Sequence, residues 1–201
     1  SRRAALDCRG QPLGHLDLGA VVDRPGGPVR HRVHQGGGGR VAVRGTPSAS
    51  VALADLARRA WLGWDLPAGE PPGLEEMKKR RAAVLDIGLP HLVAVRDDKV
   101  MGYAYASNWR PRPAYKFSVE DSIYIDKDAV GQGVGKALLP VLIEQCAALG
   151  KKQMVAVIGD SAQTPSIRLH AACGFRMVGT LENIGFKFGR WLDSVLMQRA
   201  L

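Results

Sequence analysis

A glycine-rich turn lies between a strand-like and a helix-like segment in the second half of the chain. Residues Val130–Lys136 read Val-Gly-Gln-Gly-Val-Gly-Lys, after the strand-like run Ser122–Ile125 and before the helix-like run Ala137–Ile143. Glycines in such a turn let backbone N–H groups approach a phosphate, and the positive end of the helix dipole lies behind them. The turn therefore predicts a phosphate-bearing cofactor, although turns of this spacing also serve as purely structural connections.

Hydrophobic patterning around the turn predicts an α+β domain. Residues 74–85 carry acids early and bases late, and Gly88 follows as a stop, which is typical of a helix. A hairpin is predicted at residues 97–99, between two strand-like runs. The expected strands cover residues 91–96, 100–106, 119–125, 153–158, 175–181 and about 191–198, and two later helices run from the turn to about Leu149 and over residues 165–173. A meander followed by strand–helix–strand–helix–strand predicts a sheet with helices against its faces.

The first third of the chain differs in composition from the rest. Residues 1–69 contain no Glu, Lys, Ile, Phe, Tyr, Asn or Met, and they carry ten arginines against five aspartates. We expect residues 1–48 to have little regular structure, because their Gly/Pro-rich stretches hold few large apolar groups. This segment is either a flexible tail or an out-of-frame translation of a GC-rich gene. The predicted division is an atypical segment over 1–50 and a folded domain over 51–201, which begins with a helix over 51–62.

The formal net charge of +9 suits an anionic partner. The sequence has no basic block interleaved with aromatics and no zinc-ligand spacing, so we expect neither a nucleic-acid module nor a metal site. Cys8, Cys146 and Cys173 are widely separated, which predicts reduced thiols and a cytoplasmic protein. No apolar run approaches the ~20 residues of a membrane span. No hydrophobic stretch follows residues 1–3, so neither a membrane partner nor a signal peptide is expected.

Two motifs resemble those of the GNAT superfamily of acetyl-CoA-dependent N-acetyltransferases. Residues 130–135 are similar to its pyrophosphate motif Arg/Gln-x-x-Gly-x-Gly/Ala, and residues 163–175 to its Asn-x-x-Ala/Ser-x-x-Leu-Tyr/His…Gly-Phe helix. Residues 109–115, 119–125, 155–160 and 185–191 look like segments of the phosphinothricin and methionine sulfoximine/sulfone acetyltransferases. The resemblance spans about Gly73 to Leu201. It implies a mixed, mostly antiparallel central sheet with helices on both faces, acetyl-CoA as cosubstrate and a possible homodimer.

The resemblance also implies which side chains carry the reaction. Acetyl transfer to an amine needs a neutral amine, a polarised carbonyl and a protonated leaving thiolate. Glu120 matches the acidic base of the family; without the resemblance it reads as a surface carboxylate on a strand edge. His170 falls where the superfamily often has a Tyr that protonates the thiolate, and it is equally a candidate for packing the helix into the core.

We therefore expect an enzyme that acetylates the α-amine of a small amino-acid-like acceptor such as phosphinothricin or methionine sulfoximine. One alternative keeps the chemistry but gives it a peptide or polyamine acceptor. The other is a protein that binds acetyl-CoA but is impaired in catalysis, since the resemblance does not reach residues 1–60.

Further residues are assigned to binding by the same resemblance. The cofactor set comprises the backbone of Ile123, Tyr124 and Ile125, the turn residues Gly131, Gln132, Gly133, Val134, Gly135 and Lys136, and the helix residues Gln163 and Ser166. Val130 stands where the motif has Arg or Gln, and Gln163 where it has Asn, so we expect weakened cofactor affinity. The substrate set comprises Trp109, Arg110, Arg112 and Lys116, with Phe186 and Trp191 as further pocket walls. The cations suit a carboxylate or phosphinate, but each is equally a solubilising charge, and the aromatics are equally plain core.

Overall fold

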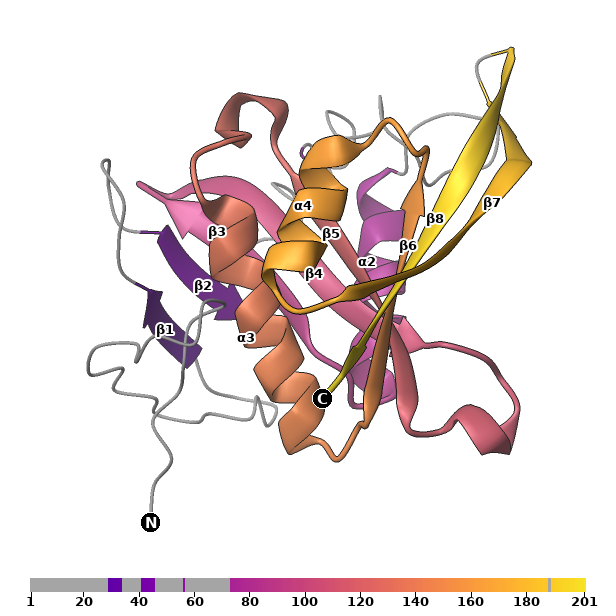
Figure 1. Cartoon of the computed structure of the whole chain (residues 1–201). Helices are drawn as coiled ribbons and strands as arrows, with labels where there is room; N and C mark the ends of the chain where they lie inside the picture. The colour runs from indigo at the N-terminus through magenta and orange to yellow at the C-terminus, as the bar shows by residue number, and fades with distance from the viewer. Residues whose placement is uncertain (1–28, 34–40, 46–55, 57–72, 188) are drawn as a thin grey trace.

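Eight strands and three helices make up the part of the chain that the computed structural model describes, residues 29–33, 41–45, 56, 73–187 and 189–201. The strands are β1 Val29–Val33, β2 Val41–Gly45, β3 His91–Arg96, β4 Lys99–Asn108, β5 Ser118–Ile125, β6 Gln153–Gly159, β7 Arg176–Lys187 and β8 Arg190–Ala200. The helices are α2 Leu74–Asp86, α3 Val134–Ala148 and α4 Thr164–Ala172, with two 3₁₀ turns, η2 Pro113–Tyr115 and η3 Lys127–Ala129. Figure 1 shows how these elements are arranged.

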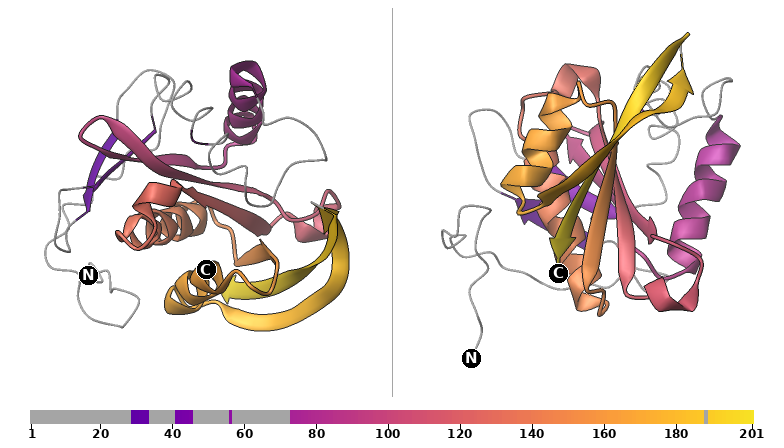
Figure 2. Two further views of the ribbon diagram at one scale, coloured as in Figure 1. Left: turned by 90° about the horizontal axis from the view of Figure 1, so that it is seen from above. Right: turned by 45° about the vertical axis from the view of Figure 1, so that its right-hand side comes forward.

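The strands form one sheet in the order β1-β2-β3-β4-β5-β6-β8-β7. The β5–β6 pair is parallel, and the other neighbouring pairs are antiparallel. Helix α2 covers one face of the sheet, while α3 and α4 cover the other (Figure 2). This arrangement confirms the predicted α+β class with helices on both faces. Among the described helices, none has the length and apolar character that crossing a membrane requires.

Helix α3 packs closely on the sheet because small side chains line the strands beneath it. Its Leu138, Leu139 and Leu142 are fully buried, and they share one core cluster with the buried Ala104 and Ala106 of β4. Burying each leucine stabilises the fold by about 1.5–3 kcal/mol. This packing fixes the position of α3, and hence of the turn that precedes it, against the centre of the sheet.

Most predicted boundaries around the turn are confirmed within two residues, but β7 is longer than expected. The β3–β4 hairpin turns at Asp97 and Asp98, whose φ angles of 47° and 59° suit a tight two-residue turn. Strand β7 continues past the predicted end at Leu181 to Lys187. A register shift between Leu181 and Gly185 interrupts its pairing with β8. The irregularity breaks the alternation of side chains that would otherwise have indicated one long strand.

Two short strands occur within the segment for which we expected little regular structure. Strand β1 pairs with β2, and β2 pairs with β3, so residues 41–45 extend the central sheet. The helix predicted over residues 51–62 lies outside the described residues except for Leu56, which is helical and fully buried. The division of the chain near residue 50 stays a prediction.

Candidate active site

The pairing between β5 and β6 stops before either strand ends. Their parallel register ends where Asp121 lies opposite Ala156, whereas β5 continues to Ile125 and β6 to Gly159. Beyond this point β5 stays paired with β4, and β6 stays paired with β8. The two strands therefore diverge, and the backbone edge of residues 123–125, which the family resemblance assigns to cofactor binding, faces the opening. An extended ligand can pair with such an edge as an added strand.

The glycine turn follows β5 at the open end of this divergence. Gly131 and Gly133 have φ angles of 79° and 80°, a left-handed conformation that glycine adopts without strain. Gly133 precedes α3 and provides no side-chain cap, so the first N–H groups of this helix point toward the turn without a capping side chain. At Gly135 a Cβ atom would lie 2.7 Å from Leu169 Cδ2, so the third glycine lets α4 approach α3. The turn combines an anion-binding geometry with close helix packing.

Glu120 lies on β5 next to the point of divergence. It is partly buried and stands opposite Ser107 of β4. Alternation along the strand places its side chain on the same face as Tyr124, which packs in the cluster that contains Met77 of α2. The neighbouring Asp121 points to the opposite face, toward α4.

His170 is buried on the α4 side of β5 in a pair with Asp121. Its Nε2 lies 3.0 Å from Asp121 Oδ2, and the two side chains are 2% and 1% exposed. Its Nδ1 lies 2.8 Å from the backbone oxygen of Ser166, with the Ser166 hydroxyl at 3.4 Å. A carboxylate and a carbonyl oxygen both accept hydrogen bonds, so a doubly protonated imidazolium satisfies both contacts.

The electrostatics of this pair agree with its geometry. Burial by itself lowers the pKa of His170, but the hydrogen bond and the charge of Asp121, together with the Ser166 carbonyl, raise it above the ordinary value. Both ring nitrogens are thus occupied within the protein. These are the contacts that the packing alternative for His170 requires, and the role as a proton donor stays a prediction.

The two predicted catalytic residues lie on opposite faces of one strand. Glu120 faces the α2 side and His170 reaches β5 from the α4 side. The gap between β5 and β6 begins after the pair of Asp121 and Ala156, and it passes through the sheet from one face to the other. A reacting group held in the opening can therefore be approached from both sides of the sheet.

The predicted substrate residues lie in the β4–β5 connection, close to the start of β5. Arg110 stacks over the Trp109 ring at 4.9 Å, and Lys116 over the Phe117 ring at 4.9 Å, while Arg112 is exposed beside η2. A backbone hydrogen bond of 3.3 Å from Trp109 to the oxygen of residue 118 ties this connection to β5 near Glu120. The structure thus brings the basic loop and the predicted base to the same end of the strand.

The aromatic residues of the β7–β8 hairpin lie elsewhere. Phe186 and Trp191 form an edge-to-face pair with ring centroids 5.1 Å apart, and both are exposed. Figure 1 shows that the tip of this hairpin and the β4–β5 connection lie at opposite ends of the sheet. In the described part of the chain, these aromatics and the basic loop do not line one common pocket.

Residues Gln163 and Ser166 lie in the first turn of α4. Gln163 is the N-cap of the helix and is partly buried, and its backbone oxygen accepts from Ser166 N at 3.0 Å. The helix starts just after β6, whose last residues lie on one side of the divergence. Both predicted residues therefore lie near the opening, across from the glycine turn.

Comparison with known proteins agrees with this geometry. The sequence profile of the acetyltransferase (GNAT) family matches residues 52–175. The chain belongs to the GNAT acetyltransferase family. The chain is 58% identical over 131 residues to a phosphinothricin N-acetyltransferase of Alcaligenes faecalis, which is 65% of this chain and 66% of the relative.

Two further relatives extend the comparison. An L-methionine sulfoximine/L-methionine sulfone acetyltransferase of Salmonella typhimurium is 40% identical over 115 residues, 57% of this chain and 67% of that protein. The crystal structure of a GNAT superfamily phosphinothricin acetyltransferase from Sinorhizobium meliloti in complex with acetyl-CoA superposes with a TM-score of 0.74 at 43% identity, over 80% of this chain and 88% of that chain. In the sequence matches the chain spans 66% and 67% of the length of these curated relatives.

Sequence reasoning missed an aromatic cluster on the face of the sheet that α2 covers. Tyr103 stacks on Tyr124 with centroids 4.7 Å apart, and His91 lies 5.8 Å from Tyr103 and 5.6 Å from Tyr105. Burial, with a smaller effect of the Arg81 charge, lowers the pKa of His91 to about 4, so the ring is neutral near pH 7. The alternation of Tyr103 and Tyr105 was visible in the sequence, but the pairing of three strands that assembles the cluster was not.

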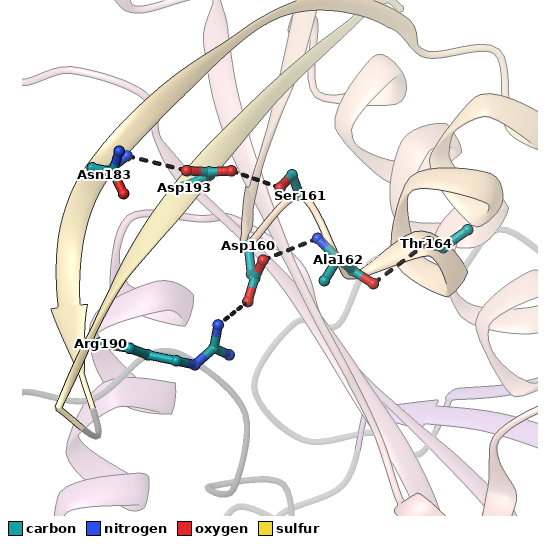
Figure 3. Close-up of polar contacts among 7 residues, drawn as sticks. All are labelled: Asp160, Ser161, Ala162, Thr164, Asn183, Arg190 and Asp193. Carbon is teal, nitrogen blue, oxygen red and sulfur yellow. Dashed lines mark hydrogen bonds and ion pairs between the residues drawn. The ribbon is translucent and has the colours of Figure 1, made fainter.

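A polar network fixes the loop between β6 and α4 (Figure 3). Asp193 of β8 accepts from the Ser161 hydroxyl at 2.6 Å and from Asn183 N at 3.1 Å, and these hydrogen bonds, the first the stronger, lower its pKa. Asp160 donates its N–H to the Asp193 carbonyl at 2.7 Å and pairs with Arg190 at 2.9 Å. The loop that leads into α4 is therefore tied to the β7–β8 hairpin.

Proposed function

We propose that the chain transfers the acetyl group of acetyl-CoA to the α-amine of a small amino-acid-like acceptor, with phosphinothricin or methionine sulfoximine as the leading acceptor class. The observation that carries this proposal is the divergence of β5 and β6, with the glycine turn at its open end and Glu120 beside its closed end. The names of the relatives and the acetyl-CoA bound to the Sinorhizobium meliloti enzyme support the choice of cosubstrate and acceptor.

In the proposed reaction Glu120 removes a proton from the acceptor ammonium, directly or through a water molecule. The neutral amine attacks the thioester carbonyl carbon, a C–N bond forms, the C–S bond breaks, and the proton lost from the nitrogen balances the one gained by the departing thiolate. Backbone N–H groups of residues 123–125 polarise the carbonyl oxygen, and Gly131–Lys136 hold the pyrophosphate.

A ternary complex fits this chain better than a protein-bound acetyl group. Burial, more than the nearby Asp121 charge, raises the pKa of Cys146 to about 12, so its thiol is a poor nucleophile. Cys173 is buried as well. Direct transfer between the two bound substrates needs neither thiol.

The basic loop before β5 supplies the acceptor site in this proposal. Arg110, Arg112 and Lys116 offer three cations near the base, and guanidinium groups bind paired oxygens of a carboxylate or phosphinate. A peptide or polyamine acceptor has no free carboxylate beside the reacting amine, so three cations at this point favour the amino-acid class.

Thiol release from acetyl-CoA, measured with a panel of acceptors at high enzyme concentration, tests the function. Turnover with phosphinothricin or methionine sulfoximine is expected. Turnover restricted to peptides or polyamines would select the second acceptor class, and acetyl-CoA binding without any turnover would indicate an impaired enzyme.

The Glu120→Gln variant tests the base. General-base catalysis contributes about a hundredfold or more, so kcat should fall by that amount while the Kd for acetyl-CoA changes little. Glu144→Gln, on the exposed face of α3, removes an equal charge away from the opening and should retain full turnover. Equal rates in the two variants would refute the role of Glu120.

We also propose that the enzyme acts in the cytoplasm as a homodimer. The exposed apolar residues of β7, Met177, Val178, Leu181 and Ile184, support a partner on this outer strand. Light scattering of the purified chain should give twice the monomer mass, and a monomeric mass at micromolar concentration would contradict the dimer.

A further inference from the structure

The glycine turn lacks the polar residue that its motif has at the first position, and an arginine from another element contacts the turn instead. Val130 occupies that position and is 56% exposed, with an apolar side chain that offers nothing to a phosphate. Arg96 is the last residue of β3. Its Nη1 donates a hydrogen bond of 2.7 Å to Oε1 of Gln132, in the middle of the turn. Nothing in the local sequence pattern connects these residues, which are 36 positions apart.

The sheet explains why Arg96 reaches this place. The β3–β4 hairpin turns just after Arg96, and β4 runs antiparallel to β5, with Gly102 opposite Ile125. The N–H of Asp126, the residue after β5, donates to the Met101 carbonyl at 2.9 Å. The hairpin and the glycine turn thus lie at the same end of the sheet, in adjacent positions.

The contact with Gln132 orients the guanidinium without using up its donors. Gln132 is itself held by a 2.6 Å hydrogen bond from Nε2 to the Asp128 carbonyl, so it provides a fixed acceptor. A guanidinium has five N–H donors in a planar fork. Within the described residues, the Arg96 Nε is buried and has no hydrogen-bond partner. The contact with Gln132 uses one donor and the buried Nε is not open to a ligand, so the remaining terminal N–H groups are the donors that a phosphate at the turn can use.

The charges around the turn increase the importance of this arginine. The hairpin and the 3₁₀ turn before the glycines carry four carboxylates, on Asp97, Asp98, Asp126 and Asp128. The lysines on the same segments are Lys99 and Lys127, and Lys136 follows in the first turn of α3. A pyrophosphate beside these carboxylates needs a further cation, because the negative charges of the carboxylates and the phosphates repel each other.

Building on the acetyl-CoA binding proposed above, we propose that Arg96 is a phosphate-binding residue of this enzyme. It supplies from β3 the contact that Val130 does not make, and it binds phosphate oxygens of acetyl-CoA next to the N–H groups of Gly131–Lys136. Loss of one charge-assisted phosphate contact raises Kd by about tenfold or more.

Calorimetric titration with acetyl-CoA tests this assignment on the full chain. Arg96→Ala should raise Kd by about tenfold or more, whereas Arg80→Ala should leave it unchanged. Arg80 is a matched control, because it is an exposed arginine of α2 with one ion pair to Glu76, and its removal changes the net charge equally. Adding Val130→Arg to the Arg96→Ala variant should restore most of the affinity, since it returns the motif's own cation to the turn.

Turnover with S-acetylpantetheine, which has no phosphates, separates phosphate binding from a structural role. The kcat/KM for this donor should be the same in the wild type and in Arg96→Ala. A loss with both donors, or no recovery on adding Val130→Arg, would mean that Arg96 only braces the turn, and the assignment would be overturned. If Arg96→Ala binds acetyl-CoA as tightly as the wild type, only the assignment of Arg96 is overturned. If the wild type itself does not bind acetyl-CoA, the proposed function is overturned as well.

Discussion

The buried pair of Asp121 and His170 makes a pH-dependent stability prediction. In Asp121→Asn the carboxylate charge disappears while the shape of the side chain is kept. At acidic pH, folding of the variant must then either bury the imidazolium without its counter-charge or remove its proton, at an exposure of 2%. Removing one partner of a buried pair typically costs about 3–5 kcal/mol. That is a large part of the total stability of a domain, about 5–15 kcal/mol.

The cost should shrink at alkaline pH, because the sign of the effect follows from the raised pKa of His170. A group whose pKa is raised on folding stabilises the native state below its unfolded pKa, here 6.5, and this stabilisation is lost as pH rises through the folded pKa. Above that value the ring is neutral in both proteins. A neutral His170 can donate Nδ1–H to the Ser166 carbonyl and accept at Nε2 from the amide that replaces the Asp121 carboxylate, so the variant then satisfies its hydrogen bonds.

Denaturant unfolding of the wild type and Asp121→Asn at about pH 5.5 and about pH 8.5 measures the difference. We expect a loss of about 3 kcal/mol or more at the acidic pH and less than about 1 kcal/mol at the alkaline pH. Asp86→Asn, an exposed position at the end of α2, should stay within ~0.5 kcal/mol of the wild type at both. An equal loss at the two pH values would contradict a titration of His170 between them.

Four further variants test other parts of the structure. The double variant Asp121→Val/His170→Phe replaces the buried pair by apolar groups and should be about as stable as the wild type. Its kcat should stay within about threefold of the wild-type value. A hundredfold fall in kcat would instead show that His170 protonates the leaving thiolate. Gly133→Ala places a side chain on a residue with φ 80°, so it should lower the free energy of unfolding by about 1–2 kcal/mol and weaken acetyl-CoA binding. Gly179→Ala is the control and should show neither effect, because a Cβ at Gly179 meets no atom within 4 Å. The wild type should lose stability as pH falls from 6.5 to about 4, because the pKa of His91 is lowered on folding and the unfolded chain binds the proton more readily. His91→Phe should show a smaller loss over this range. The same dependence of unfolding free energy on pH in both proteins would contradict the burial of His91. Asp193→Ala should speed proteolytic cleavage near residues 160–163 and lower kcat, because Asp193 holds this loop (Figure 3). Hydrogen exchange at the far end of the sheet should not change. Unchanged resistance of the loop to cleavage would contradict this role of Asp193.

Local patterns were enough to predict the elements around the glycine turn. Residues 74–86, 91–96 and 118–125 follow the periodicities of helix and strand, and left-handed glycines, Gly88 and Gly150, follow the last turns of α2 and α3. The motif predicted a phosphate-bearing ligand at the turn. The segments around it narrowed the resemblance from the GNAT superfamily to the phosphinothricin and methionine sulfoximine/sulfone acetyltransferases. These inferences depend on residues that are close in sequence, where propensity and spacing carry the information.

Contacts between distant segments could not be predicted in this way. The partner of His170 is Asp121, 49 positions away, and a strand residue of this type reads in the sequence as an exposed carboxylate. Arg96 looks like an ordinary residue at the end of a strand until the antiparallel pairing of β3, β4 and β5 places it at the turn. The irregularity within β7 depends on its pairing with β8. Each of these features follows from tertiary packing, which overrides the local preference of the residues involved.

The position of β8 between β6 and β7 has a consequence for the order of folding. The β7–β8 hairpin closes through a short connection, so it can form on the microsecond timescale of local hairpins. Its attachment to β6 pairs Gln153 with Ala200 and therefore requires the closure of a long loop, which is slow. During refolding the hairpin should be present early, and its attachment to β6 should be a late event. Enzymatic activity should then return only in the last kinetic phase, because that attachment also anchors the loop leading into α4.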